Sequence, residues 1–257
     1  MTPTLIFDLE TIPDIKGIRK LYNLEESLSD LDVVNITNFK RRQKVGHDFL
    51  PPHLHQIVAI SCVLKTDERT EVWTLGDENT NEAGILKHFF DGLDKYVPNL
   101  VSWNGTGFDL PVLNYRTLAN HISSEIYFDT GDNHSDFKWN NYMSRYHRRH
   151  LDLMDVLALY SGRNNVSLNE ICKIYDFPGK LDMDGGKVWE TFLNGDLESI
   201  RNYCETDVAN TYLVYLRYLL SKKELTVAAY TKEIDSFKEL ITRYKKTHWD
   251  NFLKAWV

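Results

Sequence analysis

Short apolar runs alternate with polar segments through the first 105 residues of the chain. Four of these runs have the length and the β-branched or aromatic content of buried strands. They are TLIFDL (4–9), QIVAISCVL (56–64), TEVWTL (70–75) and NLVSW (99–103), and EIYFDT (125–130) is a further strand candidate. Between the third and fourth runs, Ile85, Phe89 and Leu93 recur at helical spacing and predict a helix over 81–96.

Helical periodicity dominates the rest of the chain. The glycines of NGTGF turn the chain, and the following DLPVLNYRTLAN predicts a helix with Asp109 as its N-cap and Pro111 in its first turn. A polar, partly irregular connection is expected over 131–150. Further helices are predicted in LDLMDVLALY, SLNEICKIYDF and KVWETFLN and over 196–220.

This order of elements predicts one α/β domain over residues 1–257, with a mixed β-sheet flanked by helices. Residues 13–56 show no clean strand period and finish at the breaker Pro51-Pro52, so we expect a helical insertion there. The segment 224–257 carries apolar residues at helical spacing and predicts a final amphipathic helix. A chain of 257 residues is long enough to bury a large core.

The composition is that of a globular protein, with 42% hydrophobic and 26% charged residues. No apolar run approaches the roughly 18 residues of a membrane helix, and the N-terminus lacks a basic region followed by an apolar stretch. We therefore expect a soluble, cytoplasmic protein without a membrane partner. The three cysteines are odd in number and share no metal-binding spacing, which argues against a disulfide framework and against a zinc site.

The formal net charge of the chain is −7. Such a charge disfavours a protein that coats nucleic acid with its whole surface, because phosphate binding needs local positive potential. It leaves room for a local basic patch, or for bound metal ions that supply the charge.

Four acidic side chains stand where a carboxylate is expensive to place. Asp8 and Glu10 end a buried strand, and residues i and i+2 of a strand project from the same face. Asp109 stands at the start of a helix, after the fourth strand. Asp207 lies in a helix that is otherwise apolar on one side, and Tyr203, four residues earlier, shares its face.

Carboxylate oxygens are the ligands that Mg²⁺ and Mn²⁺ prefer, and four converging carboxylates would repel one another without such ions. Two ions roughly 3.5 to 4 Å apart can clamp the attacking and leaving oxygens of a phosphodiester. Each piece has a simpler interpretation: a solvated strand end for Asp8 and Glu10, a helix cap for Asp109 and a core aromatic residue for Tyr203. The order and context of these residues together favour the two-metal site.

Three segments carry a family resemblance. FDLET (7–11), NGTGFDLPVLNYR (104–116) and YCETDV (203–208) resemble the three exonuclease motifs of the DEDDy 3′-5′ exonucleases, most closely those of the proofreading exonuclease domain of family B DNA polymerases. The resemblance spans residues 7–208 and implies a ribonuclease H-like fold. Because the chain is too short for a polymerase palm and fingers, it resembles the stand-alone predicted exonucleases related to that domain.

The resemblance also implies a role for each residue of the acidic set. Asp8, Glu10 and Asp207 would hold the metal ion that activates water, and Asp8 would bridge to a second ion near Asp109 that stabilises the leaving 3′ oxygen. Tyr203 would orient the attacking water, because a phenol with a pKa near 10 is a poor base at neutral pH. The implied reaction releases nucleoside 5′-monophosphates from the 3′ end of single-stranded DNA.

Substrate contacts are expected in two places. Asn104 and Phe108 belong to the middle motif, and the resemblance implies that Phe108 contacts the terminal base, with core packing under the loop as the alternative. The basic stretches FKRRQK (39–44) and SRYHRRH (144–150) are candidates for the phosphate backbone, although a charge run is more often a solvated face. The candidate contacts in the second stretch are Arg145, Arg148 and Arg149.

Two alternatives stay open at the level of sequence. RNA exonucleases of this superfamily share the acidic site, and no residue reports on the 2′-hydroxyl group, so DNA is preferred only because the motifs are nearest to the polymerase form. The second alternative is a non-catalytic nucleic-acid-binding scaffold that kept the fold. It is disfavoured because all four carboxylates and the tyrosine are present.

Overall fold

A mixed β-sheet forms the centre of the molecule, whose computed structural model describes residues 2–181 and 183–256. Across these residues the strands are β1 (Thr4–Pro13), β2 (His55–Lys65), β3 (Thr70–Thr74), β4 (Asn99–Ser102) and β5 (His150–Asp152). They lie in the order β3-β2-β1-β4-β5, with β4 and β5 parallel to β1 and with β2 antiparallel to both of its neighbours. This is the ribonuclease H-like α/β sheet that the sequence predicts.

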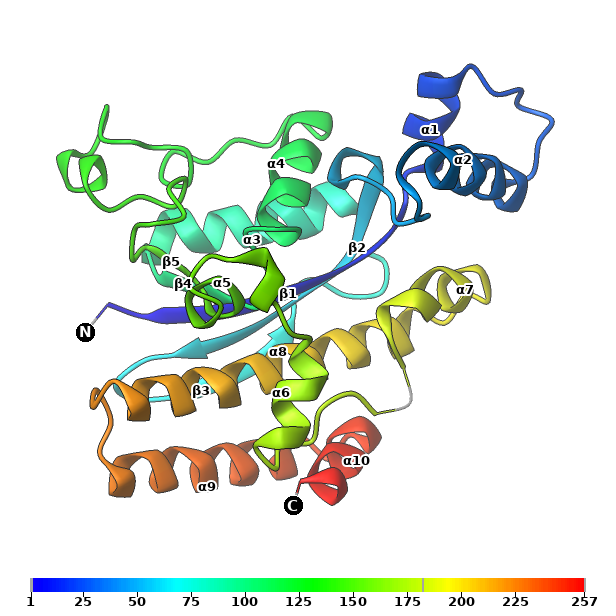
Figure 1. Cartoon of the computed structure of the whole chain (residues 1–257). Coiled ribbons are helices and arrows are strands. Elements are labelled where there is room, and N and C mark those ends of the chain that lie inside the picture. Colours follow the sequence, from blue (N-terminus) through cyan, green and yellow to red (C-terminus); the bar gives the residue numbers. More distant parts are fainter. Residues whose placement is uncertain (1, 182, 257) are drawn as a thin grey trace.

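Helices cover both faces of this sheet. The α-helices are α1 (Ile15–Tyr22), α2 (Asp30–Val45), α3 (Glu82–Tyr96), α4 (Asp109–Ala119), α5 (Leu153–Leu157), α6 (Leu168–Ile174), α7 (Val188–Leu193), α8 (Leu197–Ser221), α9 (Val227–Arg243) and α10 (Thr247–Ala255). Short 3₁₀ turns are η1 (Pro52–Leu54), η2 (Ser135–Lys138), η3 (Gly162–Asn164) and η4 (Gly185–Lys187). Figure 1 shows α3 and α4 on one side of the sheet and α8, backed by α9 and α10, on the other. In the part of the chain that the structure describes, no helix is both long and apolar enough to span a bilayer.

The alternation of side chains along β1 divides the core between the two faces. Leu5 and Phe7 pack in the cluster under α3 and α4, whereas Ile6 packs in the cluster under α8. Asp8 and Glu10 follow Ile6 with the same period of two. The two carboxylates therefore lie on the face of the sheet that α8 covers.

The helices α1 and α2 occupy the segment 13–56, where a helical insertion is expected. Ile18, Val33, Leu50 and Leu54 form a small core of their own between these helices and η1. The insertion thus carries its own apolar packing and projects from the end of β1 (Figure 1).

An ionic network joins this insertion to the main body. The guanidinium of Arg116, on α4, donates hydrogen bonds to Asp14 at 2.6 Å and to the two carboxylate oxygens of Glu82 at 2.8 and 2.6 Å. Asp14 also accepts the backbone N–H of Gly17 at 3.0 Å and so caps α1. Because the arginine and both acids are largely buried, the network sets the position of α1 against α4.

Two predicted elements are wrong because strand pairing is decided by distant neighbours. EIYFDT, expected as a strand, consists of turns whose apolar side chains Ile126 and Tyr127 fill the core beneath α3 and α4. LDLMDVLALY, expected as a helix, contributes to β5 and then forms the short α5. Residues 150–152 are extended because they pair with β4, which no local pattern encodes.

The C-terminal segment differs from the single helix expected there. It forms α9 and α10, which are separated at Lys245 by a left-handed residue with φ +52°. The break lets α10 fold back so that Trp249 and Phe252 pack in the same cluster as Phe237 of α9. Helical spacing of apolar residues is present in both parts, so periodicity alone does not reveal the turn.

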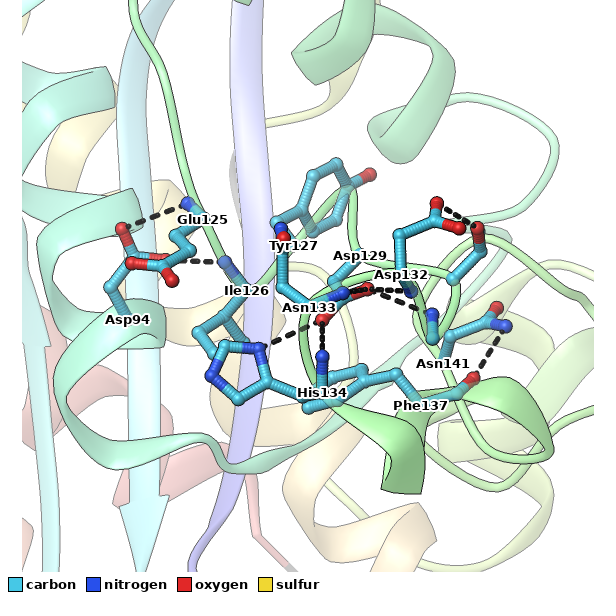
Figure 2. A network of polar contacts seen from close by, with 12 residues as sticks. Asp94, Glu125, Ile126, Tyr127, Asp129, Asp132, Asn133, His134, Phe137 and Asn141 are labelled. Carbon is cyan, nitrogen blue, oxygen red and sulfur yellow. Dashed lines mark hydrogen bonds and ion pairs between the residues drawn. The ribbon is translucent and has the colours of Figure 1, made fainter.

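Polar contacts rather than regular structure hold the long connection between α4 and β5 (Figure 2). Asp94 of α3 accepts hydrogen bonds from the Ser124 hydroxyl and from the backbone N–H of Ile126. Asp129 accepts the backbone N–H groups of Gly131 and His134 at 2.8 Å each, and its carboxylate lies 2.8 Å from the His134 ring. Burial by itself would raise the pKa of Asp129, but these hydrogen bonds lower it to about 2.

Asp129→Asn is expected to destabilise the protein at neutral pH, because the amide cannot replace a carboxylate that collects several N–H donors. A lowered carboxyl pKa contributes stability that is fully present above the unfolded-state pKa of about 3.9 and is lost as the pH falls toward 2. The difference in Tm between wild type and variant, measured by circular dichroism from pH 7 to pH 3, should therefore shrink below pH 4. A difference that is constant over this range would contradict the assignment.

Candidate active site

The carboxylates of Asp8 and Glu10 stand between apolar neighbours on one face of β1. Ile6 and Ile12, which flank them on the same strand, are buried in clusters that include residues of α8. Glu10 is only 8% exposed, and Asp8 is half-buried. The pairing of β1 with β2 shifts register between Glu10 and Thr11, a β-bulge of the kind that re-aims side chains beside active sites.

Asp109 reaches the same place from α4. The prediction that it caps this helix is wrong: Phe108 is the N-cap, and Asp109 is the first helical residue. Its buried carboxylate accepts the backbone N–H of Leu9, which lies between the two acids of β1. The helix start therefore directs the side chain at β1 instead of back at the helix.

Helix α8 adds a carboxylate and a phenol. Tyr203 and Asp207 stand one turn apart, and the Tyr203 hydroxyl donates a hydrogen bond to Asp207. Cys204, which the sequence analysis did not assign to the site, lies with its sulfur 3.4 Å from the backbone carbonyl of Asp8 and 3.7 Å from its carboxylate. Potential ligand atoms of Asp8, Glu10 and Cys204 all lie within 4.8 Å of one another.

Burial raises the pKa of all four carboxylates, and repulsion from other members of the set adds to it at Asp8 and Glu10. Burial is the largest cause that raises the pKa of Asp8 well above its usual range, followed by the charges of Asp109, Glu10 and Asp207. The pKa of Glu10 is raised for the same reasons. Burial raises the pKa of Asp109 to about 7 and that of Asp207 to about 6. Without compensating cations, the set would therefore retain protons near neutral pH.

Lys180 is a site residue that the sequence analysis missed. Its ammonium lies 3.9 Å from a carboxylate oxygen of Asp207 and 5.3 Å from the centre of the Tyr203 ring. Its positive charge lowers the pKa of Asp8, Glu10 and Asp207 against the raising effect of burial. Lys180 lies in the connection between α6 and α7, where one lysine among many carries no local signal of its partner.

The donor set fits hard divalent cations. Among the described residues, Asp207 Oδ1 is buried without a hydrogen-bond partner, so one oxygen of this acid is available to a ligand that the protein itself does not supply. The remaining donors are carboxylates, which suit Mg²⁺ or Mn²⁺. Burial raises the pKa of Cys204 well above its usual value, so it remains a thiol that donates to Asp8 and does not act as a soft-metal ligand.

Asp152 supports the loop that leads to Asp109. Its carboxylate accepts the backbone N–H groups of Asn104 and Thr106 at 2.9 Å each, and it also caps α5 through Met154. Asp152 therefore caps α5 and holds the loop before α4 at the same time. Asn104 lies in this loop in the left-handed conformation, with φ +64°.

Phe108 forms an aromatic contact between α4 and the insertion. Its ring centre lies 5.4 Å from that of Phe49 and 5.0 Å from that of His55. His55 is buried, whereas Phe49 is 58% exposed. An apolar surface therefore opens to solvent next to the residue that precedes Asp109.

The three arginines proposed as phosphate contacts have different environments. Arg145 forms an ion pair with Asp155 at 2.7 Å, and Arg149 lies over the Phe137 ring at 4.6 Å. Arg148 is exposed. Within residues 2–181 and 183–256, none of the three forms a hydrogen bond or ion pair with the four carboxylates.

Comparisons with known proteins agree with these features. A family model described as a predicted 3′-5′ exonuclease related to the exonuclease domain of PolB matches residues 47–256. This match includes Asp109, Tyr203 and Asp207, whereas Asp8 and Glu10 precede it. The chain is also 25% identical over 181 residues to a DNA polymerase of Archaeoglobus fulgidus, a match that covers 68% of the chain and 22% of the polymerase. The chain thus spans about a fifth of the length of that relative.

In the absence of metal at pH 8, Asp109→Asn is expected to raise the free energy of unfolding by roughly 1–3 kcal/mol. With a pKa of about 7 in the folded protein, Asp109 loses its proton in the unfolded state first, so the wild type loses stability as the pH rises from about 4 to above 7. Urea denaturation in EDTA measures the difference, which should vanish below pH 4, where both states are protonated.

The matched control for this measurement is Glu239→Gln, which changes an exposed acid on α9. It should leave the free energy of unfolding within about 0.5 kcal/mol of the wild-type value. A destabilised Asp109→Asn protein at pH 8 would show that the carboxylate is satisfied by the fold itself.

Proposed function

We propose that this chain hydrolyses single-stranded nucleic acid from the 3′ end and releases nucleoside 5′-monophosphates. The proposal follows from its family, because the chain belongs to the predicted 3′-5′ exonucleases related to the exonuclease domain of PolB. One observation carries the proposal. Carboxylates from β1, α4 and α8, far apart in the sequence, interact with one another at one place in the fold. Such a cluster is strongly unfavourable unless it holds cations, and it is the donor set for phosphodiester hydrolysis.

Asp8, Glu10, Asp109 and Asp207 would hold the cations, for which we propose two Mg²⁺ or Mn²⁺ ions. When bound, such ions polarise the scissile phosphate and lower the pKa of water. Because the folded site raises the pKa values of the four acids, the carboxylates would release protons as the ions bind.

Tyr203 is assigned to positioning. Burial and the neighbouring carboxylates raise its pKa above the usual value, so the phenol stays protonated over the working pH range and does not act as a general base. Its hydroxyl donates to Asp207, which places an O–H group beside the proposed path of the attacking water. In the reaction, the water oxygen bonds to the phosphorus of the terminal nucleotide as the bond from that phosphorus to the 3′ oxygen of the preceding nucleotide breaks. The water gives up a proton and the leaving 3′ oxygen takes one up, so the products are a nucleoside 5′-monophosphate and a strand with a 3′-hydroxyl end.

Lys180 is assigned to the support of Asp207. Its ammonium lies close enough to favour the ionised carboxylate and packs over the ring of Tyr203. It would thus hold both partners of the Tyr203–Asp207 hydrogen bond in place while leaving the carboxylate ready to bind a cation.

We favour DNA over RNA as the substrate because the matched relative is a DNA polymerase. An exoribonuclease would use the same carboxylates. The three cysteines are free and buried, which suits a reducing compartment such as the cytoplasm.

Asp8→Ala is expected to lower kcat at least roughly 1,000-fold, and Tyr203→Phe roughly 10- to 100-fold, because the first change removes a cation ligand and the second only a positioning hydroxyl. A 5′-labelled single-stranded DNA and its RNA counterpart are incubated with Mg²⁺, Mn²⁺ or EDTA, and products are separated by length. The expected result is a metal-dependent ladder that shortens from the 3′ end.

Two results of this assay would count against the proposal. If neither strand is shortened with either metal, the chain is not an exonuclease on these substrates. If Asp8→Ala binds the strands as the wild type does and neither protein degrades them, the non-catalytic scaffold is the better description.

Lys180→Gln is expected to lower kcat roughly 10-fold or more and to move the acidic limb of the pH–rate profile to higher pH. The direction follows because the lysine charge lowers the pKa of Asp207, so its loss lets Asp207 take up a proton at higher pH. Lys180→Arg keeps the charge and should restore the profile of the wild type. If the acidic limb of the pH–rate profile is unchanged in Lys180→Gln, Lys180 does not support Asp207 in the reaction.

A further inference from the structure

A groove of about 670 Å³ lies between α1 and α7, at the end of β1 that carries the insertion. Ile12 and Pro13 line it, so it begins two residues beyond Glu10 on the same strand. Trp189 of α7, another lining residue, packs in the same apolar cluster as Tyr203. The groove therefore adjoins the proposed active site, and Figure 1 shows α1 and α7 at the same end of β1.

One wall of the groove is aromatic. The rings of Trp189 and Phe192 stack with their centres 6.1 Å apart and their planes at 15°, and both residues are half-buried. This wall thus offers planar apolar surface.

The opposite wall is basic. Lys16 and Lys20 are exposed, stand four residues apart on α1 and form no ion pair with any described residue. Arg19, between them, donates to the carbonyl oxygens of Glu25 and Leu28 and pairs with Asp30 at 3.1 Å. The two lysines are therefore the cations available to a ligand.

The charge balance of the groove also favours an anion. The acidic residues among its lining are Glu26 and Asp30, and Arg19 neutralises Asp30. Two lysines then face one remaining acid, in a chain whose overall charge is −7. The lining therefore carries a small net positive charge, against the sign of the whole chain.

The basic wall is held in a fixed position. Arg116 joins Asp14, the N-cap of α1, to α4, whose first residue is Asp109. The separate core of Ile18 and Val33 holds α1 on α2. A ligand in the groove would therefore meet a preformed surface with a defined relation to the carboxylates.

We infer that this groove binds the nucleotides that precede the 3′-terminal residue of a single-stranded nucleic acid. The bases stack on Trp189 and Phe192, and the phosphates lie along Lys16 and Lys20. Base stacking on aromatic rings combined with lysines along the backbone is how proteins hold single strands without reading sequence. The direction of the strand in this inference rests on the proposed function, because it requires the 3′ end to lie at the carboxylates.

The test uses the full chain in EDTA, where no turnover occurs, and 5′-fluorescein-labelled dT10, rU10 and dT2 as probes in fluorescence anisotropy. For Lys16→Glu/Lys20→Glu, the Kd for dT10 should rise at least tenfold and rise much less for dT2. The slope of log Kd against log salt concentration should fall by about 1.4, the value for two lost phosphate contacts on a single strand. Comparison of dT10 with rU10 shows whether the groove distinguishes the sugars.

Two further variants complete the design. Trp189→Leu keeps an apolar side chain but removes the stacking surface, so Kd for dT10 should rise roughly 5- to 100-fold with an unchanged salt slope. Lys232→Glu/Lys254→Glu makes the same charge change at exposed lysines on α9 and α10 and should leave Kd unchanged. Circular dichroism spectra and Tm values establish that each variant is folded.

Equal effects on dT10 of the groove variant and of the α9–α10 control would overturn the inference, as would equal effects of the groove variant on dT10 and dT2. The proposed function is judged separately from degradation of unlabelled strands with Mg²⁺. If the unlabelled strands are degraded but the groove variants do not change Kd, the exonuclease proposal stands and the groove inference is wrong. If the groove variants raise Kd but no strand is degraded, the groove is a strand-binding surface and the exonuclease proposal is wrong.

Discussion

Repulsion among buried carboxylates is the constraint on which the rest of this structure depends. Asp8, Glu10, Asp109 and Asp207 are brought together in the fold, where burial raises the pKa of each and repulsion within the set adds to it at Asp8 and Glu10. Left to itself, such a cluster would separate its charges or take up protons. The surrounding fold prevents the separation of the charges, and bound cations would prevent the uptake of protons.

The fold prevents separation because each acid belongs to an element that is secured elsewhere. β1 is the central strand of the sheet, and α8 is buried along much of its length. The loop before Asp109 is held by the carboxylate of Asp152 through two backbone N–H groups. Apolar packing and backbone hydrogen bonds thus stabilise an arrangement that electrostatics alone disfavours, which is common where function opposes stability.

The insertion gives this site a second side. It is linked to α4 by the Arg116 network, brings Phe49 against Phe108 and places the lysines of α1 across from the aromatic residues of α7. The family match begins at residue 47, after both helices of the insertion, so the lysines of α1 precede it, as Asp8 and Glu10 do.

The sequence by itself determined the faces of the elements and the residues that share them. Asp8 and Glu10 share a face because strands have a period of two, and Tyr203 and Asp207 because helices bring i and i+4 together. Only the tertiary structure decided what met those faces. Residues 150–152 became a strand by pairing with β4, Asp109 turned toward Leu9, and Lys180 found Asp207. The physical reason is that periodicity is a local property of the backbone, whereas these partners are selected by packing between segments far apart in the chain.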